Sequence, residues 1–286
     1  MSANAQQRID WNGDSGAGWL ANQERLDRML APFGAAALDR ALLRPGEHVL
    51  DIGCGSGEST LAIADRVGPS GLALGIDISE PLLGRARERA VDILSLADFR
   101  LADASSTPLP MAGFDCLFSR FGVMFFDDPM AAFSHLRTCL KPGGRFVFAC
   151  WRGAAENDWT KLPMTAIRDM IPADPPSLPE APGPFSFGDP RRVERLLAGA
   201  GFTDIDLDPL DRPIVFGRGT TKEEAVDDAL GRAFAVGPLR RALAGKSDDV
   251  TMRAAAAVHA AFARRVIGRE VVIDGAAWIV SARNPR

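Results

Sequence analysis

Residues 49–57 read VLDIGCGSG, a stretch in which an apolar strand runs directly into a glycine-rich turn. Apolar positions spaced for a helix follow the turn over Glu58–Val67. Glycines tolerate positive φ and let a ligand approach the backbone closely, and they alternate here at Gly53, Gly55 and Gly57. A strand, a glycine turn and a helix start in this order place bare backbone N–H groups beside a ligand.

The same alternation of strand and helix continues through the first half of the chain. Further apolar strands are expected at residues 72–77, 97–103, 114–121 and 145–151. One helix is expected after Ser79, which reads as its N-cap, and another from about Met130 to Leu140. Strands and helices that alternate at this spacing predict an α/β fold with a doubly wound, mostly parallel sheet.

The second half has a different rhythm. Residues 152–171 look helical, and Pro172–Pro190 holds seven prolines, which indicates an irregular segment that acts either as a lid or as a linker. Residues 202–210 alternate like an edge strand, and residues 271–283 read as the last strand. Between these two strands, residues 221–267 predict two or three alanine-rich helices.

Composition describes an ordinary globular protein of 286 residues that is 47 % hydrophobic, with a formal net charge of -4. The charge argues against nucleic acid as a partner. The four cysteines form no C-x-x-C pair, and we expect buried free thiols rather than disulfides or a metal site. The N-terminus has no signal-peptide pattern and no apolar run approaches ~20 residues, so we expect a cytoplasmic protein without a membrane span.

Two acidic residues decide which ligand suits the glycine turn. Asp77 ends the second strand, where a carboxylate accepts both hydroxyls of an adenosine ribose. Asp51 lies before the glycines, and its charge would repel the pyrophosphate of a dinucleotide. The spacing is also G-x-G-x-G rather than G-x-G-x-x-G. S-adenosylmethionine, which carries a sulfonium, an ammonium and no phosphate, suits Asp51; a helix-capping role for Asp51 is the alternative.

Four segments in order resemble the motifs of class I S-adenosylmethionine-dependent methyltransferases. They read VLDIGCGSGEST, ALGIDIS, LADASSTPLPMAGFDCLFS and LKPGGRFVFACW. The subgroup that the chain resembles acts on small molecules, like the C-methyltransferases of quinone biosynthesis. The resemblance covers residues 45–151 closely and implies a seven-stranded sheet whose last strand is antiparallel, with a helical insertion as a cap.

The resemblance also implies residue roles. It assigns the methionine part of the cofactor to Asp51, Gly53 and Gly55, the ribose to Asp77 and the adenine to Ile78, Asp103 and Ala104. It places Ser119 and Arg120 beside the methyl group. The whole chain, 1–286, then forms a single methyltransferase domain. Its parts are a helical cover (1–44), a cofactor-binding core (45–151), a proline-rich segment with an edge strand (152–220), a helical cap (221–270) and the last strand (271–286).

The acceptor is less well defined by the sequence. Aromatic residues that follow strands or lie in the N-terminal segment predict a pocket for an apolar or aromatic small molecule, and with Arg120 the candidates are Trp11, Trp19, Phe121 and Trp151. The chain has no tyrosine, and its three histidines read as structural, so no catalytic base is assigned and no metal is expected. An NAD-type oxidoreductase and a cofactor-binding protein without methyl transfer remain as alternatives, and a monomer and a homodimer are equally compatible with the sequence.

Overall fold

The structure, a computed structural model, describes residues 4–171 and 181–286. Its centre is one sheet in the order β3-β2-β1-β4-β5-β8-β6, with the short β7 paired to β8. The strands are β1 (His48–Ile52), β2 (Leu72–Asp77), β3 (Asp98–Leu101), β4 (Phe114–Arg120), β5 (Leu140–Trp151), β6 (Thr203–Arg218), β7 (Val266–Ile267) and β8 (Glu270–Arg283). Strands β1–β5 are parallel, and β8 runs antiparallel to both β5 and β6. The expected doubly wound sheet with an antiparallel last strand is therefore confirmed.

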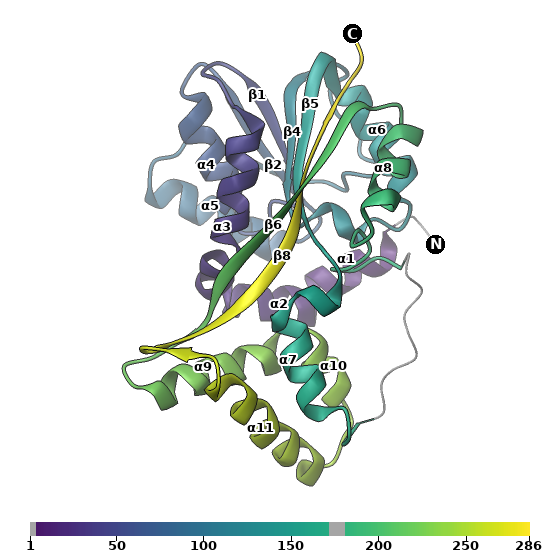
Figure 1. The fold of residues 1–286 in the computed structure, drawn as a ribbon. Helices are drawn as coiled ribbons and strands as arrows, with labels where there is room; N and C mark the ends of the chain where they lie inside the picture. Colours follow the sequence, from purple (N-terminus) through teal and green to yellow (C-terminus); the bar gives the residue numbers. More distant parts are fainter. Residues whose placement is uncertain (1–3, 172–180) are drawn as a thin grey trace.

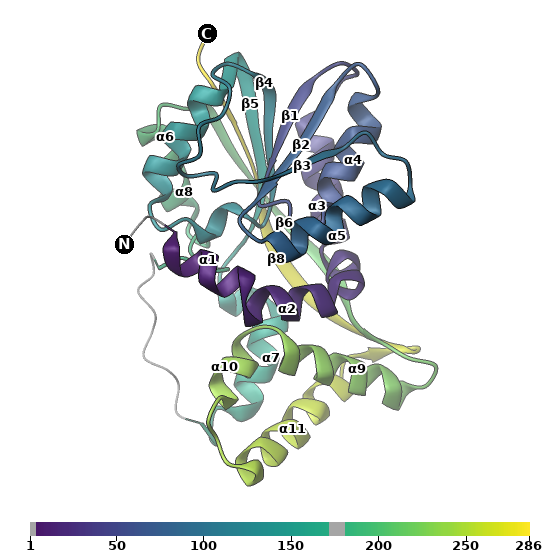
Figure 2. The same ribbon diagram turned by 180° about the vertical axis from the view of Figure 1, so that it is seen from behind.

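Helices cover both faces of this sheet (Figures 1 and 2). α3 (Gln23–Ala41), α4 (Glu58–Val67) and α5 (Glu80–Asp92) lie on one side, and α6 (Pro129–Cys139) and α8 (Pro190–Gly199) lie on the other. Strand residues such as Leu50, Phe118 and Phe148 are buried between these layers, as continuous apolar strands require. The four cysteines are buried and free, as expected. Among the described helices, none has the length and apolarity needed to cross a membrane.

Strands β6 and β8 extend well beyond the rest of the sheet. β5 pairs with β8 only as far as Ala277, whereas residues 211–218 of β6 continue to pair with residues 270–276 of β8. The sequence predicted only residues 202–210 of β6, where the residues alternate clearly as in an edge strand. The far half belongs to the strand because the side chains of Ile214 and Phe216 are buried against helices.

This two-stranded arm carries a second group of helices (Figure 1). The group comprises α7 (Asp158–Ile167), α9 (Lys222–Ala235), α10 (Pro238–Leu243) and α11 (Asp248–Ala263). α1 (Ala5–Asn12) and α2 (Asp14–Ala21) cross the molecule between this group and the carboxyl ends of the parallel strands (Figure 2). The helix expected over 152–171 is shorter than predicted, and residues 172–180 of the proline-rich stretch lie outside the described residues.

Candidate functional site

The glycine turn after β1 lines a cavity, here called the glycine-turn cavity, at the carboxyl ends of β1–β4. Its walls include Gly53, Gly55, Asp77 and Arg120. The backbone of Gly53 has φ 65° and that of Gly55 has φ 54°, so both need the left-handed region that glycine adopts without strain. A Cβ at Gly53 would lie 2.8 Å from the Gly122 Cα, whereas one at Gly55 would meet no atom within 4 Å. Gly53 therefore allows the turns after β1 and β4 to pack against each other, and Gly55 leaves open space beside its backbone.

Backbone donors fix the carboxylate of Asp77 at the wall of this cavity. Its Oδ2 accepts a hydrogen bond from the Gly55 N–H at 2.8 Å, and its Oδ1 accepts one from the Ser79 N–H at 2.9 Å. Burial raises the pKa of Asp77 above its usual value, although these N–H groups favour the charged form. Ser79 stands at the expected N-cap position, but its hydroxyl donates to the Trp11 carbonyl instead of capping the helix.

Asp51 lies behind the turn and does not line the cavity itself. Its carboxylate is fully buried, and Oδ2 accepts hydrogen bonds from the hydroxyls of Ser59 (2.6 Å) and Thr60 (2.7 Å). Its Oδ1 has no hydrogen-bond partner among the described residues. Burial raises the pKa of Asp51 to about 6, against the lowering effect of the two hydroxyls and of Arg120. This electron-rich, under-bonded oxygen beside a glycine turn suits a cation or a water molecule.

The other predicted cofactor residues are distributed over the cavity and the layer behind it. Ile78, Asp103 and Ala104, which the resemblance assigns to the adenine, line the cavity. Ser119 does not, because its buried hydroxyl donates to the Ile52 carbonyl and accepts from the Gly122 N–H, which braces the turn after β4. Arg120 lines the cavity with its guanidinium held by Asp27 at 3.0 Å and Glu58 at 2.9 Å.

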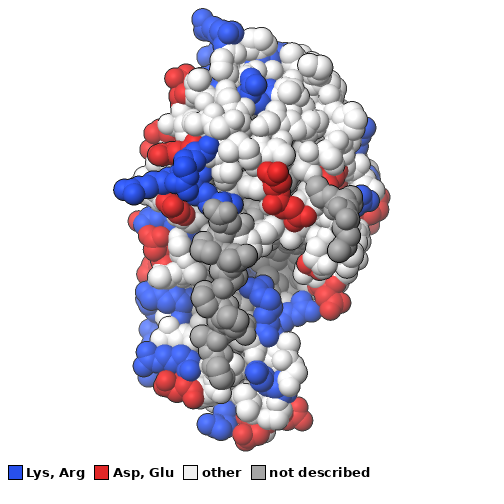
Figure 3. Space-filling view, turned by 90° about the vertical axis from the view of Figure 1, so that its right-hand side faces the viewer, with Lys and Arg blue, Asp and Glu red and all other residues white. Residues whose placement is uncertain are grey.

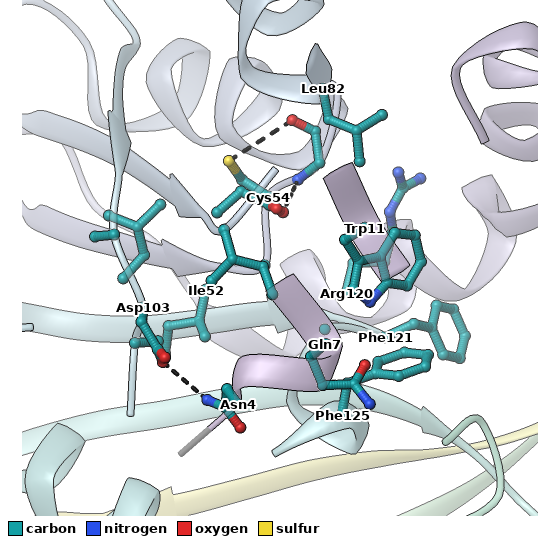
Figure 4. A pocket seen from close by; sticks show the side chains of 18 of the residues that line it. Asn4, Gln7, Trp11, Ile52, Cys54, Leu82, Asp103, Arg120, Phe121 and Phe125 are labelled. Carbon is teal, nitrogen blue, oxygen red and sulfur yellow. Dashed lines mark hydrogen bonds between the residues drawn. The ribbon is translucent and has the colours of Figure 1, made fainter. Parts of the chain in front are cut away.

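The N-terminal segment supplies site residues that the sequence did not suggest. Asn4 donates from its side chain to Asp103 Oδ1 at 2.9 Å (Figure 4). It also exchanges two hydrogen bonds with Asp127. Gln7 lines the same cavity. Asn4 and Gln7 are single polar residues in a segment without hydrophobic periodicity, so no sequence pattern marks them as site residues. Only the fold brings them to the cavity.

A second, apolar cavity of about 400 Å³ adjoins the first, and its lining includes residues of α1–α3 and of α7, α9 and α10. Four aromatic residues line both cavities: Trp11, Trp19, Phe121 and Phe125. Phe121 has φ 62°, a strained value for a bulky residue, and its ring stacks on Trp151 at 4.2 Å. The structure therefore brings together the predicted pocket aromatics, although Trp151 lines the apolar cavity only. Within the described residues, no histidine lines either cavity.

Comparisons with known proteins agree with this geometry. Residues 50–148 match the family described as methyltransferase domain. The chain is 31% identical over 183 residues to nocamycin O-methyltransferase of Saccharothrix syringae, a match that covers 61% of this chain and 65% of that protein. It is 38% identical over 106 residues to demethylmenaquinone methyltransferase of Symbiobacterium thermophilum, with 36% and 42% covered. The chain thus spans less than two thirds of the length of both relatives.

Solved structures show the same fold. One is phosphoethanolamine N-methyltransferase 2 of Haemonchus contortus, crystallised with phosphomonomethylethanolamine and S-adenosylhomocysteine. It aligns with a TM-score of 0.52 at 18% identity and covers 89% of this chain and 53% of that one. The resemblance indicated by the sequence is confirmed over residues 50–148, the part of the chain that matches the methyltransferase domain.

Proposed function

We propose that the protein binds S-adenosylmethionine in the glycine-turn cavity and transfers its methyl group to a small, apolar or aromatic acceptor in the adjoining apolar cavity. The observation that carries the proposal is the placement of two carboxylates, Asp77 and Asp51, around one glycine turn without a basic residue for a phosphate. Arg120 lines the cavity, but Asp27 and Glu58 already neutralise it. These residues fit a cationic nucleoside and oppose a dinucleotide.

Each residue has a role in this proposal. Asp77 accepts the ribose hydroxyls, Gly55 leaves room for the methionine part, and Asp51, which lies behind the turn, attracts the ammonium across the turn or through a water molecule. The cofactor supplies an electrophilic methyl group, so the chain mainly has to align the acceptor and exclude water, which can lower the barrier by on the order of 7–11 kcal/mol. The shared aromatic rings, with Phe121 at the junction, are suited to that alignment.

The test uses the enzyme, methyl-labelled S-adenosylmethionine and a metabolite extract of the source organism, with products read by mass spectrometry. We expect a labelled small molecule and S-adenosylhomocysteine in equal amounts, because one methyl transfer yields one of each. Asp77→Ala is the control that must lose both products. Binding of S-adenosylmethionine without a labelled product in any extract would favour the alternative of a cofactor-binding protein.

A further inference from the structure

The apolar cavity has one property that its aromatic walls do not explain, namely the sign of its charged residues. Its described lining contains three arginines and one carboxylate: Arg232, Arg240, Arg241 and Asp14. The rest of the lining is mostly aromatic and aliphatic. An excess of positive charge around an apolar cavity favours a ligand with a negatively charged group.

Arg232, on α9, is the buried member of this set. Its side chain is only 4% exposed, and its nearest carboxylate oxygen, on Asp228, lies 3.8 Å away. The other oxygen of Asp228 lies 2.7 Å from Arg25, which is therefore the closer partner of that carboxylate. The Nη1 of Arg232 donates to the Arg25 carbonyl at 3.3 Å, and its Nε has no hydrogen-bond partner among the described residues.

A buried cation with unused donors is costly in the empty protein. Burial lowers the pKa of Arg232 to about 10, so the guanidinium is still charged at neutral pH. The ring of Phe216 lies 5.1 Å below it and offsets part of the cost by a cation–π contact. Neither the ring nor the distant Asp228 satisfies the free Nε, so the guanidinium retains the capacity to bind an anion from the cavity.

The other two arginines lie on α10 and are exposed. Arg240 is 3.4 Å from Asp14, whose side chain is 94% exposed, and Arg241 makes no ion pair with any described residue. In Figure 3 a hollow opens on this side of the molecule, and positive side chains gather below it. Such a rim raises the local concentration of anions at the entrance.

We propose that the apolar cavity binds a flat, apolar or aromatic carboxylic acid, with its carboxylate on Arg232 and with Arg241 attracting it at the entrance. The proposal rests on the proposed function in one respect, because the rings shared by the two cavities would hold the body of this acid next to the methyl donor. A planar guanidinium with a free donor is well suited to a carboxylate.

The test compares 2-naphthoate with 2-naphthamide, two planar molecules of nearly equal shape of which only the first is charged. Calorimetry on the full chain should show that 2-naphthoate binds at least tenfold more tightly, and that Arg232→Met removes this preference. Arg152→Met is the matched control, since Arg152 also lies over an aromatic ring, that of Trp278 at 5.2 Å, but outside the cavity. It should keep the preference.

Equal affinity for the two probes in the wild type, or a preference that survives in Arg232→Met, would overturn the proposal. If Arg232→Met does not fold, the exposed variant Arg241→Gln decides: we expect the preference to fall about threefold, and an unchanged preference contradicts the proposal. A parallel titration with S-adenosylmethionine separates the two ideas. Wild type that prefers naphthoate but fails to bind S-adenosylmethionine would sink the proposed function and leave the anion site standing.

Discussion

The two cavities share four aromatic side chains but are built from different kinds of structure. The glycine-turn cavity is formed at the ends of parallel strands, where residues that are close in the sequence, such as Gly53 and Gly55, lie together in its wall. The apolar cavity is formed where α2 and α3 meet α9 and α10, two pairs of helices whose lining residues are far apart in the chain. Local sequence motifs therefore define the first cavity, whereas the second forms only when helices distant in the sequence pack together.

The charged residues that line the two cavities also differ in sign. The glycine-turn cavity has the carboxylates of Asp77 and Asp103 in its wall and a neutralised arginine, while the apolar cavity has three arginines and one exposed aspartate. A cationic cofactor and an anionic acceptor would each enter the cavity of opposite charge. The predictions below test this division, from the largest expected effect to the smallest.

Asp77→Ala should abolish the first cavity's selectivity and leave the second cavity intact. The variant loses the proposed ribose acceptor and leaves the N–H groups of Gly55 and Ser79 unpaired. We expect the affinity for S-adenosylmethionine to fall about 1,000-fold, or about 4 kcal/mol, by calorimetry. Affinity for 2-naphthoate should stay within about twofold. A similar loss for both ligands would mean that the two cavities are not independent.

Asp51→Asn should raise the free energy of unfolding of the ligand-free protein and weaken its binding of S-adenosylmethionine. Because the pKa of Asp51 is raised from 3.8 to about 6 in the folded state, the wild type keeps its full stability below about pH 4 and loses part of it as the pH rises towards 6. At pH 7.5 the variant should gain about 2–3 kcal/mol in the free energy of unfolding, from denaturant melts. At pH 4 the gain should vanish; a constant gain would contradict burial as the cause.

The sequence predicted the first cavity far better than the second, and these residues show why. Strand β2 begins and ends where the sequence places it, because it is an apolar run bounded by turn residues, and the position of Asp77 follows from that boundary. Arg232 lies in an alanine-rich segment that gives no sign of which face is buried. Only the arm of β6 and β8 brings α9 over the core, and of this arm the sequence predicted β8 but missed the far half of β6.

Cofactor affinity should depend on pH through the same carboxylate. A bound cation favours the charged form of Asp51, so binding releases its proton and tightens as the pH rises towards about 6, then levels off. At pH 5 we expect affinity for S-adenosylmethionine about tenfold lower than at pH 7.5. Asp51→Asn should flatten this profile. If the variant keeps the slope, Asp77, whose pKa is also raised, is the responsible group.

Alanine substitutions at Gly53 and Gly55, two of the three glycines of the turn, should give the smallest effects, and the difference between them tests one specific contact. Gly55→Ala should cost only the left-handed backbone, about 1 kcal/mol, because its Cβ meets no atom within 4 Å. Gly53→Ala should cost about 1 kcal/mol more, because its Cβ would lie 2.8 Å from the Gly122 Cα. Thermal melts of both variants measure the difference. Equal costs would show that the turn after β4 can move away from Gly53.

The account depends most on the claim that the carboxylates at the ends of β1 and β2 select a cationic nucleoside over a phosphorylated one. Calorimetric titration of the wild type with S-adenosylmethionine and with NAD⁺ under identical conditions tests it directly. We predict saturable binding of S-adenosylmethionine and no measurable heat from NAD⁺ at millimolar concentration. Saturable binding of NAD⁺ with no binding of S-adenosylmethionine would contradict the account.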